Sequence, residues 1–384
     1  MVEAAGVYVH LPYCRRKCAY CDFFSVPWSR PQAVRLTAAL CREIAGRLPR
    51  LQDALRTVFI GGGTPSVWPE DLLGRVLEAL GEHAPAEGWR EYTVEANPGS
   101  LTAGVTRLLR RHGADRLSIG AQSFDDGVLE TLGRGHRAGQ IGEAVRRARD
   151  AGFERLNLDL IFAVPGQTLT GWRRTLDAAV ALDPEHLACY GLTYEPGTPL
   201  DRQRRAGRIA AADERTEAAM YEAAIDVLTV AGYEHYEISN FARPGQRCRH
   251  NELYWVNGQY VGIGPGATSF LDGLRRTTWR DIEAYIAAMQ AGREPPGDSE
   301  QLNPQARAGE TAMLMLRRID GLRFDEFAAR TGVDARRHFA DAIARHVAGG
   351  LLAADAAGIC LTRRGLLLAN EVLADFVAAP AGCG

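Results

Sequence analysis

The sequence predicts an α/β protein: a partial (β/α)6 TIM-like barrel followed by a smaller C-terminal α+β domain of winged-helix-like pattern. Three observations support this. Short apolar runs alternate with amphipathic segments, polar or glycine residues follow nearly every apolar run, and a Gly- and Pro-containing stretch separates the C-terminal part. A chain of 384 residues is long enough for one large and one smaller domain.

Six βα units can be traced along the first half of the chain. Their short apolar runs predict strands at residues 7–11, 57–60, 92–95, 117–120, 156–162 and 187–192. Helical periodicity predicts intervening helices at residues 33–48, 69–80, 102–111, 140–151 and 169–182. Repeated βα units imply a parallel sheet. Six units are too few for an eight-fold barrel, so a partial barrel and an open doubly wound sheet are the two candidates.

The polar residues at the strand ends favour the barrel. Cysteines follow the first strand, residues 61–65 (GGGTP) the second and residues 95–98 (EANP) the third. Gln122 follows the fourth strand and Asp159 lies within the fifth. A barrel gathers the ends of all its strands around one mouth, whereas an open sheet offers only its switch point.

The C-terminal part is expected to form a separate domain. Residues 291–298 contain Gly, paired Pro and charge and are interpreted as a linker, which gives domains at 1–290 and 300–384. Helical patterns at 304–316, 324–330 and 335–348, then short strands around Leu351 and 359–361, resemble a winged helix. Winged helices often bind DNA, but a basic recognition helix is missing, so we expect a structural or partner-binding role.

Composition limits the partners and the compartment. The 45 basic and 47 acidic residues give a net charge of −2, which does not favour nucleic acid. The N-terminus has no secretion-signal pattern, and no apolar stretch reaches the ~18 residues that a membrane helix needs. We therefore expect a cytoplasmic protein that binds no nucleic acid and has no stable membrane anchor.

Three of the eight cysteines form the strongest motif in the sequence. Cys14, Cys18 and Cys21 form a C-x3-C-x2-C array directly after the first strand. Local thiolates of this kind hold iron-sulfur clusters, and three cysteines without a nearby fourth leave one iron of a cubane open. The alternatives are a zinc site that adds His10, a redox cysteine pair and a packing coincidence.

This array, with Tyr20 just before the third cysteine, resembles the radical S-adenosylmethionine superfamily. Residues 61–65 are similar to the glycine-rich segment of that family, where backbone groups approach the amino group of the methionine moiety. The resemblance implies a [4Fe-4S] cluster on Cys14, Cys18 and Cys21, with S-adenosylmethionine on the open iron. The cofactor would supply the chemistry, and the protein would orient it and exclude water.

About the first 270 residues resemble the oxygen-independent coproporphyrinogen III oxidase branch of that superfamily. The shared segments are residues 8–14 (YVHLPYC), 62–66 (GGTPS), 95–98 (EANP) and 120–124 (GAQSF). Taken individually, some of these residues also have ordinary structural explanations, such as helix capping or a surface charge. The resemblance implies S-adenosylmethionine contacts from Tyr8, Tyr20, Gly62, Gly63, Thr64, Glu95, Gln122, Arg134 and Asp159.

Three features resemble the HemW-type haem chaperones within this branch. Asp22 and Phe23 follow the third cysteine, whereas the motif of the true dehydrogenase continues as Cys-x-Cys after it. The N-terminal extension usual in that enzyme is also missing. Residues 250–255 (HNELYW) match the His-Asn-x-x-Tyr-Trp motif associated there with haem. The resemblance implies His250 as a haem ligand. An ordinary hydrogen-bonding histidine is the alternative, and the role of Cys248 stays open between a second ligand and a buried thiol.

Three functions follow from these resemblances. The favoured one is a haem chaperone that binds haem and transfers it to an unidentified acceptor protein. The others are an oxygen-independent coproporphyrinogen III dehydrogenase and a radical enzyme with another substrate. The radical machinery is present, yet we do not expect dehydrogenase activity.

Overall fold

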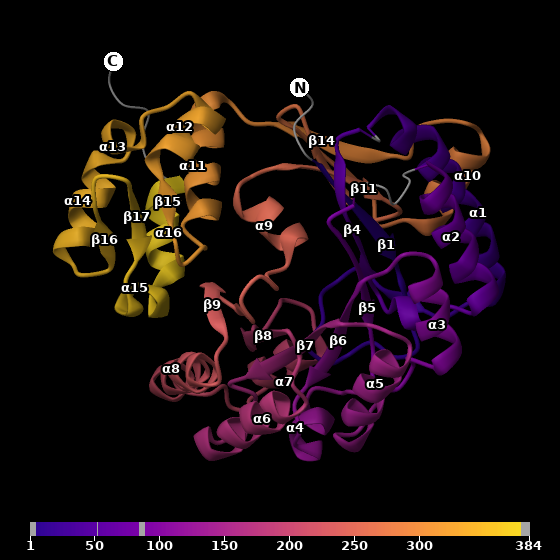
Figure 1. Cartoon of the computed structure of the whole chain (residues 1–384), viewed down its shortest axis with the longest axis horizontal. Coiled ribbons are helices and arrows are strands. Elements are labelled where there is room, and N and C mark those ends of the chain that lie inside the picture. The colour runs from indigo at the N-terminus through magenta and orange to yellow at the C-terminus, as the bar shows by residue number, and fades with distance from the viewer. Residues whose placement is uncertain (1–4, 52, 84–88, 378–384) are drawn as a thin grey trace.

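The described chain is built on one large curved sheet, with a smaller sheet in a C-terminal unit beside it (Figure 1). The computed structural model describes residues 5–51, 53–83 and 89–377. The strands of the large sheet lie in the order β14-β13-β12-β11-β1-β4-β5-β6-β7-β8-β10-β9.

Six neighbouring strands of this sheet run parallel and form the predicted partial barrel. They are β1 (Ala5–Leu11), β4 (Leu55–Gly62), β5 (Glu91–Ala96), β6 (Arg116–Gln122), β7 (Arg155–Phe162) and β8 (His186–Gly191). Parallel strands are covered on both faces, which explains their nearly continuous apolar runs. In β1, for example, Val7, Val9 and Leu11 are fully buried. The prediction of a partial barrel is confirmed.

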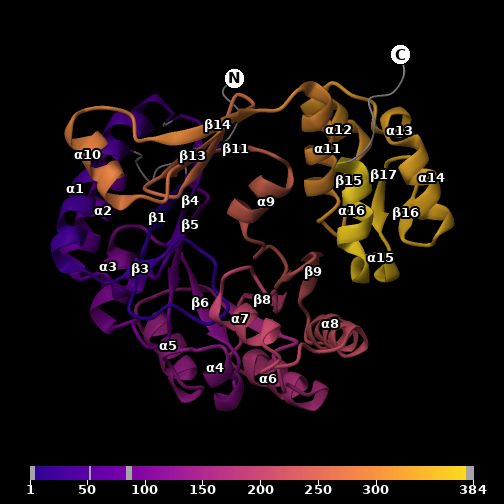
Figure 2. The same cartoon turned by 180° about the vertical axis from the view of Figure 1, so that it is seen from behind.

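Helices cover the outer side of the barrel (Figures 1 and 2). They are α1 (Arg30–Arg47), α2 (Glu70–His83), α3 (Ala103–Arg111), α5 (Gly139–Asp150), α6 (Leu169–Ala181) and α8 (Glu214–Val230). The shorter helices α4 (Asp126–Thr131) and α7 (Pro199–Arg205) instead pack near the loop that follows β1. Each of the five predicted helices is present. In α1 the buried residues Leu36, Leu40 and Ile44 recur every fourth position and form the apolar stripe of an amphipathic helix. The hydroxyls of Thr102 and Thr168 cap α3 and α6.

Short strands extend the sheet at both ends. On one side these are β11 (Gln259–Ile263), β12 (Thr268–Leu271), β13 (Leu274–Thr278) and β14 (Gly297–Gln301), and on the other β10 (Asn240–Ala242) and β9 (Glu234–Glu237). β14 begins inside the segment that we expected to be a linker, so the sheet runs past the boundary drawn at residue 290. The sequence of β14 is polar, and backbone pairing with β13 rather than apolar alternation makes it a strand.

The C-terminal unit has its own core around Phe327, Phe339 and Phe376. Three predicted helical segments and a hairpin are present, with the third segment divided at Phe339. The elements are α11 (Pro304–Met315), β15 (Leu322–Arg323), α12 (Phe324–Thr331), α13 (Ala335–His338), α14 (Ala340–Ala348), β16 (Leu352–Ala354), β17 (Gly358–Leu361), α15 (Arg363–Leu367) and α16 (Ala369–Val377). We did not predict α15 and α16.

The helix α10 (Ile282–Gln290) precedes the C-terminal unit and packs against α1 of the barrel.

The short helix α9 (Arg249–Trp255) lies at the amino ends of the barrel strands (Figure 1). Its position depends on Glu91, the first residue of β5, whose side chain is fully buried. The Glu91 carboxylate accepts hydrogen bonds from the Cys248 thiol and from the backbone amides of Arg249 and His250, at 3.0–3.2 Å. It also pairs with Arg155 at 2.7 Å. Burial alone would raise the pKa of Glu91, but Arg116, Arg155 and these amides hold it below its ordinary value.

None of the helices in the described residues combines the length and the apolar character that a membrane span requires.

We predict that Glu91→Gln destabilises the protein by about 3–5 kcal/mol at neutral pH, because it leaves buried arginine charge uncompensated. The exposed pair Arg147–Glu143 provides the control, since Glu143→Gln should change stability little. The lowered pKa means that the carboxylate stabilises the fold above pH 4.5 and loses this effect as the pH falls further. Thermal unfolding of the three proteins between pH 3 and 7 tests this. If Glu91→Gln lowered the stability by the same amount at every pH, the electrostatic explanation would be contradicted.

Candidate functional site

A cavity of about 390 Å³ lies at the carboxyl ends of the barrel strands. Residues from the loop after β1 and from the ends of β4, β5, β6, β7 and β8 line it, as expected for a barrel mouth. Of the thirteen predicted site residues, eleven line this cavity: Cys14, Cys18, Tyr20, Cys21, Gly62, Gly63, Thr64, Glu95, Gln122, Arg134 and Asp159. Tyr8 and His250 are not among the lining residues.

The loop that carries the three cysteines is held at both ends and in its middle. β2 (Tyr13–Cys14) pairs with β3 (Val26–Pro27) where the loop begins and ends. Ala19 donates its amide to the Leu132 carbonyl at 3.0 Å and accepts from the Leu200 amide at 2.8 Å. The loop is therefore fixed over the mouth by two other segments of the barrel.

The three thiols are free and partly buried against the cavity. The Cys14 Sγ lies 3.3 Å from the Thr64 hydroxyl, and the Cys18 Sγ accepts a hydrogen bond from Arg134 Nη1 at 3.3 Å. Burial raises the pKa of Cys14, and it raises that of Cys21 to about 11. The thiols of Cys14 and Cys21 are therefore protonated at neutral pH until a metal replaces their protons.

The zinc alternative required His10 as a fourth ligand. Its Nδ1 is hydrogen-bonded to the Tyr8 hydroxyl at 3.0 Å, and its Nε2 to the Phe24 carbonyl at 2.8 Å. Burial lowers the His10 pKa to about 4, so the ring is neutral and both nitrogens are engaged. This arrangement favours a three-cysteine site over a Cys3His zinc site.

The glycine-rich segment passes directly beneath the cysteine loop. Gly62 has φ +108°, and a Cβ atom there would lie 2.7 Å from the His10 ring. A Cβ atom on Gly63 would lie 2.7 Å from the backbone of Pro12 and Tyr13. Only glycine fits at either position, and the bare backbone forms part of the cavity wall.

Two partly buried carboxyl groups line the cavity. Burial, with a further contribution from Asp159, raises the pKa of Glu95 to about 8, and burial also raises that of Asp159. Glu95 accepts a hydrogen bond from the Gly62 amide at 3.3 Å, and Asp159 accepts from Asn157 at 2.8 Å and Ser118 at 3.2 Å. A cationic ligand would favour the ionised form of both groups, so this part of the cavity suits an ammonium or sulfonium group.

Arg134 provides a positive group in the same cavity. Its Nη2 donates to the Gly120 carbonyl at 2.7 Å, while its buried Nε has no hydrogen-bond partner among the described residues. An unsatisfied buried donor of this kind suits a carboxylate of a bound ligand. Gln122 lies beside it with φ +66°, an uncommon conformation for a residue other than glycine.

Comparison with known proteins agrees with this site. Residues 8–179 match the Radical SAM superfamily, and residues 302–368 match the HemN C-terminal domain. The chain is 34% identical to the curated "Heme chaperone HemW" of Bacillus subtilis, over 97% of this chain and 99% of that protein. The chain belongs to the HemW family. A HemW of Mycobacterium tuberculosis is 36% identical over 96% of this chain and 93% of its own length.

A solved structure supports the fold of this family member. The coproporphyrinogen III oxidase HemN of Escherichia coli superimposes with a TM-score of 0.83 over 98% of this chain and 91% of that one. Its sequence identity is 23%, so the likeness concerns the fold. Membership in the radical SAM superfamily implies a [4Fe-4S] cluster and S-adenosylmethionine. The three thiols fit such a cluster, and the two carboxyl groups and the unpaired Arg134 Nε fit S-adenosylmethionine.

His250, from the family's haem-associated motif, lies outside the cavity and is buried with 1% exposure. Its Nδ1 is hydrogen-bonded to the Thr57 hydroxyl at 2.8 Å, and its Nε2 to the Tyr254 hydroxyl at 2.9 Å. Burial lowers its pKa to about 4, and its ring stacks on Phe59. Both nitrogens are engaged in this arrangement, and haem ligation by His250 stays a prediction.

Tyr8 is also placed away from the cavity. It lines a separate pocket of about 240 Å³ together with His10, Tyr254 and Tyr260. Its hydroxyl is bonded to His10, as described above, so the predicted contact with S-adenosylmethionine does not follow from this arrangement.

Sequence reasoning missed several residues that line the cavity. Ser118 and Ile161 lie on β6 and β7. The others are Tyr190 and Gly191 at the end of β8, and Leu192, Thr193 and Glu195 after it. Ser118, Gly120 and Gln122 are alternate positions of one strand, so they share the inner face of the barrel. Applying this alternation to the predicted strands would have identified Ser118.

We predict that Glu95→Gln stabilises the ligand-free protein at pH 8 and above but not at pH 4.5. The folded-state pKa of Glu95 is about 8 and the ordinary value is 4.5, so the wild type loses stability as the pH rises between them. Gln has no charge and avoids this loss. Thermal unfolding of ligand-free protein from pH 4.5 to 9 tests the prediction, with the exposed Glu154→Gln as control. A difference that does not depend on pH would contradict it.

Proposed function

We propose that this protein is a haem chaperone, which binds haem and passes it to an acceptor protein. The supporting observation is the similarity to curated HemW haem chaperones, which extends over nearly the full length of both chains. The proposal includes a [4Fe-4S] cluster held by Cys14, Cys18 and Cys21, with S-adenosylmethionine on its open iron. His250 is retained as a proposed haem ligand, and its ring would have to leave Thr57 or Tyr254 to reach the iron.

The residues of the cavity suggest how S-adenosylmethionine would be held. The two carboxyl groups of Glu95 and Asp159 suit its cationic groups, and the free Nε of Arg134 suits its carboxylate. The backbone of Gly62 and Gly63 allows close approach of the ligand. These side chains would orient S-adenosylmethionine and exclude water, and the chemistry that a bound cluster would supply is transfer of one electron to that ligand.

We predict that Cys18→Ala abolishes the cluster. Loss of one of three thiolates removes a ligand that no other lining cysteine can replace. After anaerobic reconstitution, the variant should lack the visible absorption and electron paramagnetic resonance signal of the wild type. Cys41→Ala, in α1, is the matched control and should retain both. Cluster signals of wild-type intensity in the Cys18 variant would refute the ligand set.

The competing function is oxidative decarboxylation of coproporphyrinogen III. We test it because the chain shares the fold of HemN. We predict no turnover by reconstituted protein with reductant and S-adenosylmethionine under anaerobic conditions, beside an authentic dehydrogenase that converts the substrate. Asp22 and Phe23 stand after the third cysteine where the dehydrogenase motif continues as Cys-x-Cys, and this difference supports the expectation. Formation of protoporphyrinogen would overturn the chaperone proposal.

A further inference from the structure

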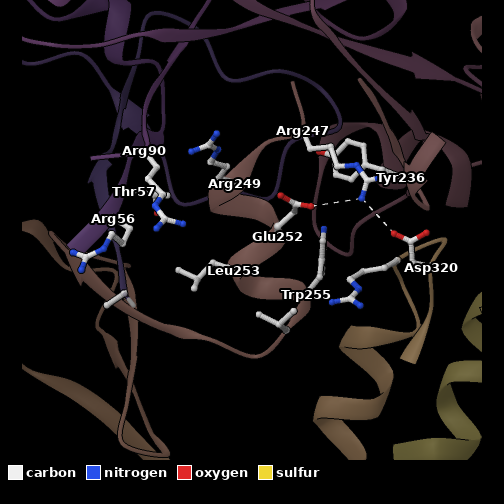
Figure 3. Close-up of a pocket in the computed structure, with 13 residues that line it drawn as sticks. Arg56, Thr57, Arg90, Tyr236, Arg247, Arg249, Glu252, Leu253, Trp255 and Asp320 are labelled. Atoms are coloured by element: carbon white, nitrogen blue, oxygen red, sulfur yellow. Dashed lines mark hydrogen bonds and ion pairs between the residues drawn. The ribbon is translucent and has the colours of Figure 1, made fainter. Parts of the chain in front are cut away.

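A second pocket, of about 590 Å³, lies at the opposite end of the barrel from the cysteines (Figure 3). The starts of β1 and β4, the outward side of α9 and the loop before β15 line it. It therefore lies where the amino ends of the parallel strands meet the C-terminal unit. No predicted site residue lines it.

Arginine dominates the charge of this pocket. Five arginines face two acidic residues, Glu252 and Asp320, in a chain whose net charge is −2. Arg247 pairs with both acids, at 3.8 and 3.3 Å, and Arg318 pairs with Glu326 at 3.1 Å. The other three arginines of the pocket are Arg56, Arg90 and Arg249.

The three remaining arginines form an unpaired group on one side of the pocket. Figure 3 shows Arg56, Arg90 and Arg249 together there. Within residues 5–51, 53–83 and 89–377, no carboxylate lies within ion-pair distance of any of them. Arg56 donates one hydrogen bond to the Leu55 carbonyl at 2.8 Å. A guanidinium binds a carboxylate through two parallel hydrogen bonds, so three guanidinium groups without a carboxylate partner on one wall suit a ligand with more than one carboxylate.

The other wall is apolar and has one unsatisfied donor. Leu253, Trp255 and Val256 of α9 and its C-cap are half-buried and line the pocket. The Trp255 Nε1 is buried, yet it has no hydrogen-bond partner among the described residues. A buried donor without an acceptor is unfavourable, so this atom indicates a ligand with an acceptor group as well as an apolar surface.

We propose that this pocket binds haem through its two carboxylates, which Arg56, Arg90 and Arg249 hold, with Leu253 and Trp255 against the ring. This proposal rests on the proposed chaperone function and adds where haem is held. Haem combines two carboxylates with a flat apolar body, and the volume is within the range of cofactor sites, ~300–1,000 Å³.

The proposal divides the haem-associated motif between two faces of α9. His250 and Tyr254 face inward, where they bond to each other and His250 bonds to Thr57. Trp255 lines the pocket on the other side. In this arrangement His250 positions the helix and the outward face binds haem, so this site is an alternative to direct ligation of the iron by His250.

The test is a haem titration of the full-length protein by absorbance, comparing wild type with the double variant Arg90→Ala/Arg249→Ala. Both side chains are exposed, so the variant should fold normally. Arg146→Ala/Arg173→Ala removes two exposed arginines far from the pocket as the matched control. We expect the pocket variant to bind haem about tenfold or more weakly and the control to bind like the wild type.

The dimethyl ester of haem, in which both carboxylates are blocked, separates this contact from general loss of affinity. Wild type and pocket variant should bind the ester equally and weakly. Equal haem affinity of the wild type and the pocket variant would overturn the proposed site and leave the chaperone function standing. Lack of haem binding by the wild type would instead overturn the chaperone function. Loss of binding in His250→Ala alone, with the arginine variant unchanged, would assign haem to His250 and reject the pocket.

Discussion

The buried carboxylate of Glu91 is the interaction on which the arrangement of both ends of the barrel depends. Removing an ionised carboxylate from water is costly, and the cost is offset here by Arg155, by the nearby Arg116 and by donors from three consecutive residues. Those donors belong to the start of α9, so the same charge that β5 buries fixes the position of a helix more than 150 residues away in the sequence. With the helix so placed, His250 reaches Thr57 of β4 and its ring stacks on Phe59, while the outer face of the helix is left open to the arginine-lined pocket.

A chain of hydrogen bonds runs through the barrel from this carboxylate to the cysteine cavity. Asn157 donates to Asp159, which lines the cavity, and accepts from His186 at 2.6 Å. His186 accepts in turn from the Tyr236 hydroxyl at 2.7 Å, and that hydroxyl accepts from the amide of Cys248, whose thiol donates to Glu91. Burial holds the pKa of His186 well below its ordinary value, so the ring is neutral and its single proton suits one donor and one acceptor role. This chain of hydrogen bonds connects Asp159 in the cysteine cavity with Glu91 beneath the start of α9.

The barrel strands and most of the predicted cavity residues could be identified from the sequence, because both follow from local patterns. Apolar runs identify buried parallel strands, and polar residues at strand ends converge wherever the strands form a barrel. The polar strand β14 gave no such pattern, because pairing with β13 rather than apolar alternation defines it. Nor could the sequence show that His250 faces inward, since its environment is set by Thr57 and Glu91 from distant strands. Nor could the sequence show that the Tyr8 hydroxyl is hydrogen-bonded to His10, and its contact with S-adenosylmethionine stays a prediction.

The C-terminal unit acquires a defined role from the contacts that join it to the barrel. The amide of Ile238, just after β9, donates to the Arg317 carbonyl at 3.0 Å. Asn257, after α9, donates to the Thr311 hydroxyl of α11 at 2.9 Å. Arg317 also lies over the ring of Trp255 at 4.7 Å. These contacts place Arg318 and Asp320 in the second pocket, so the winged-helix-like unit completes a wall that the barrel leaves open. Because this wall is contributed by a separate unit with its own core, a small change in how the two units pack would alter the pocket while the barrel and its cysteine cavity stay intact.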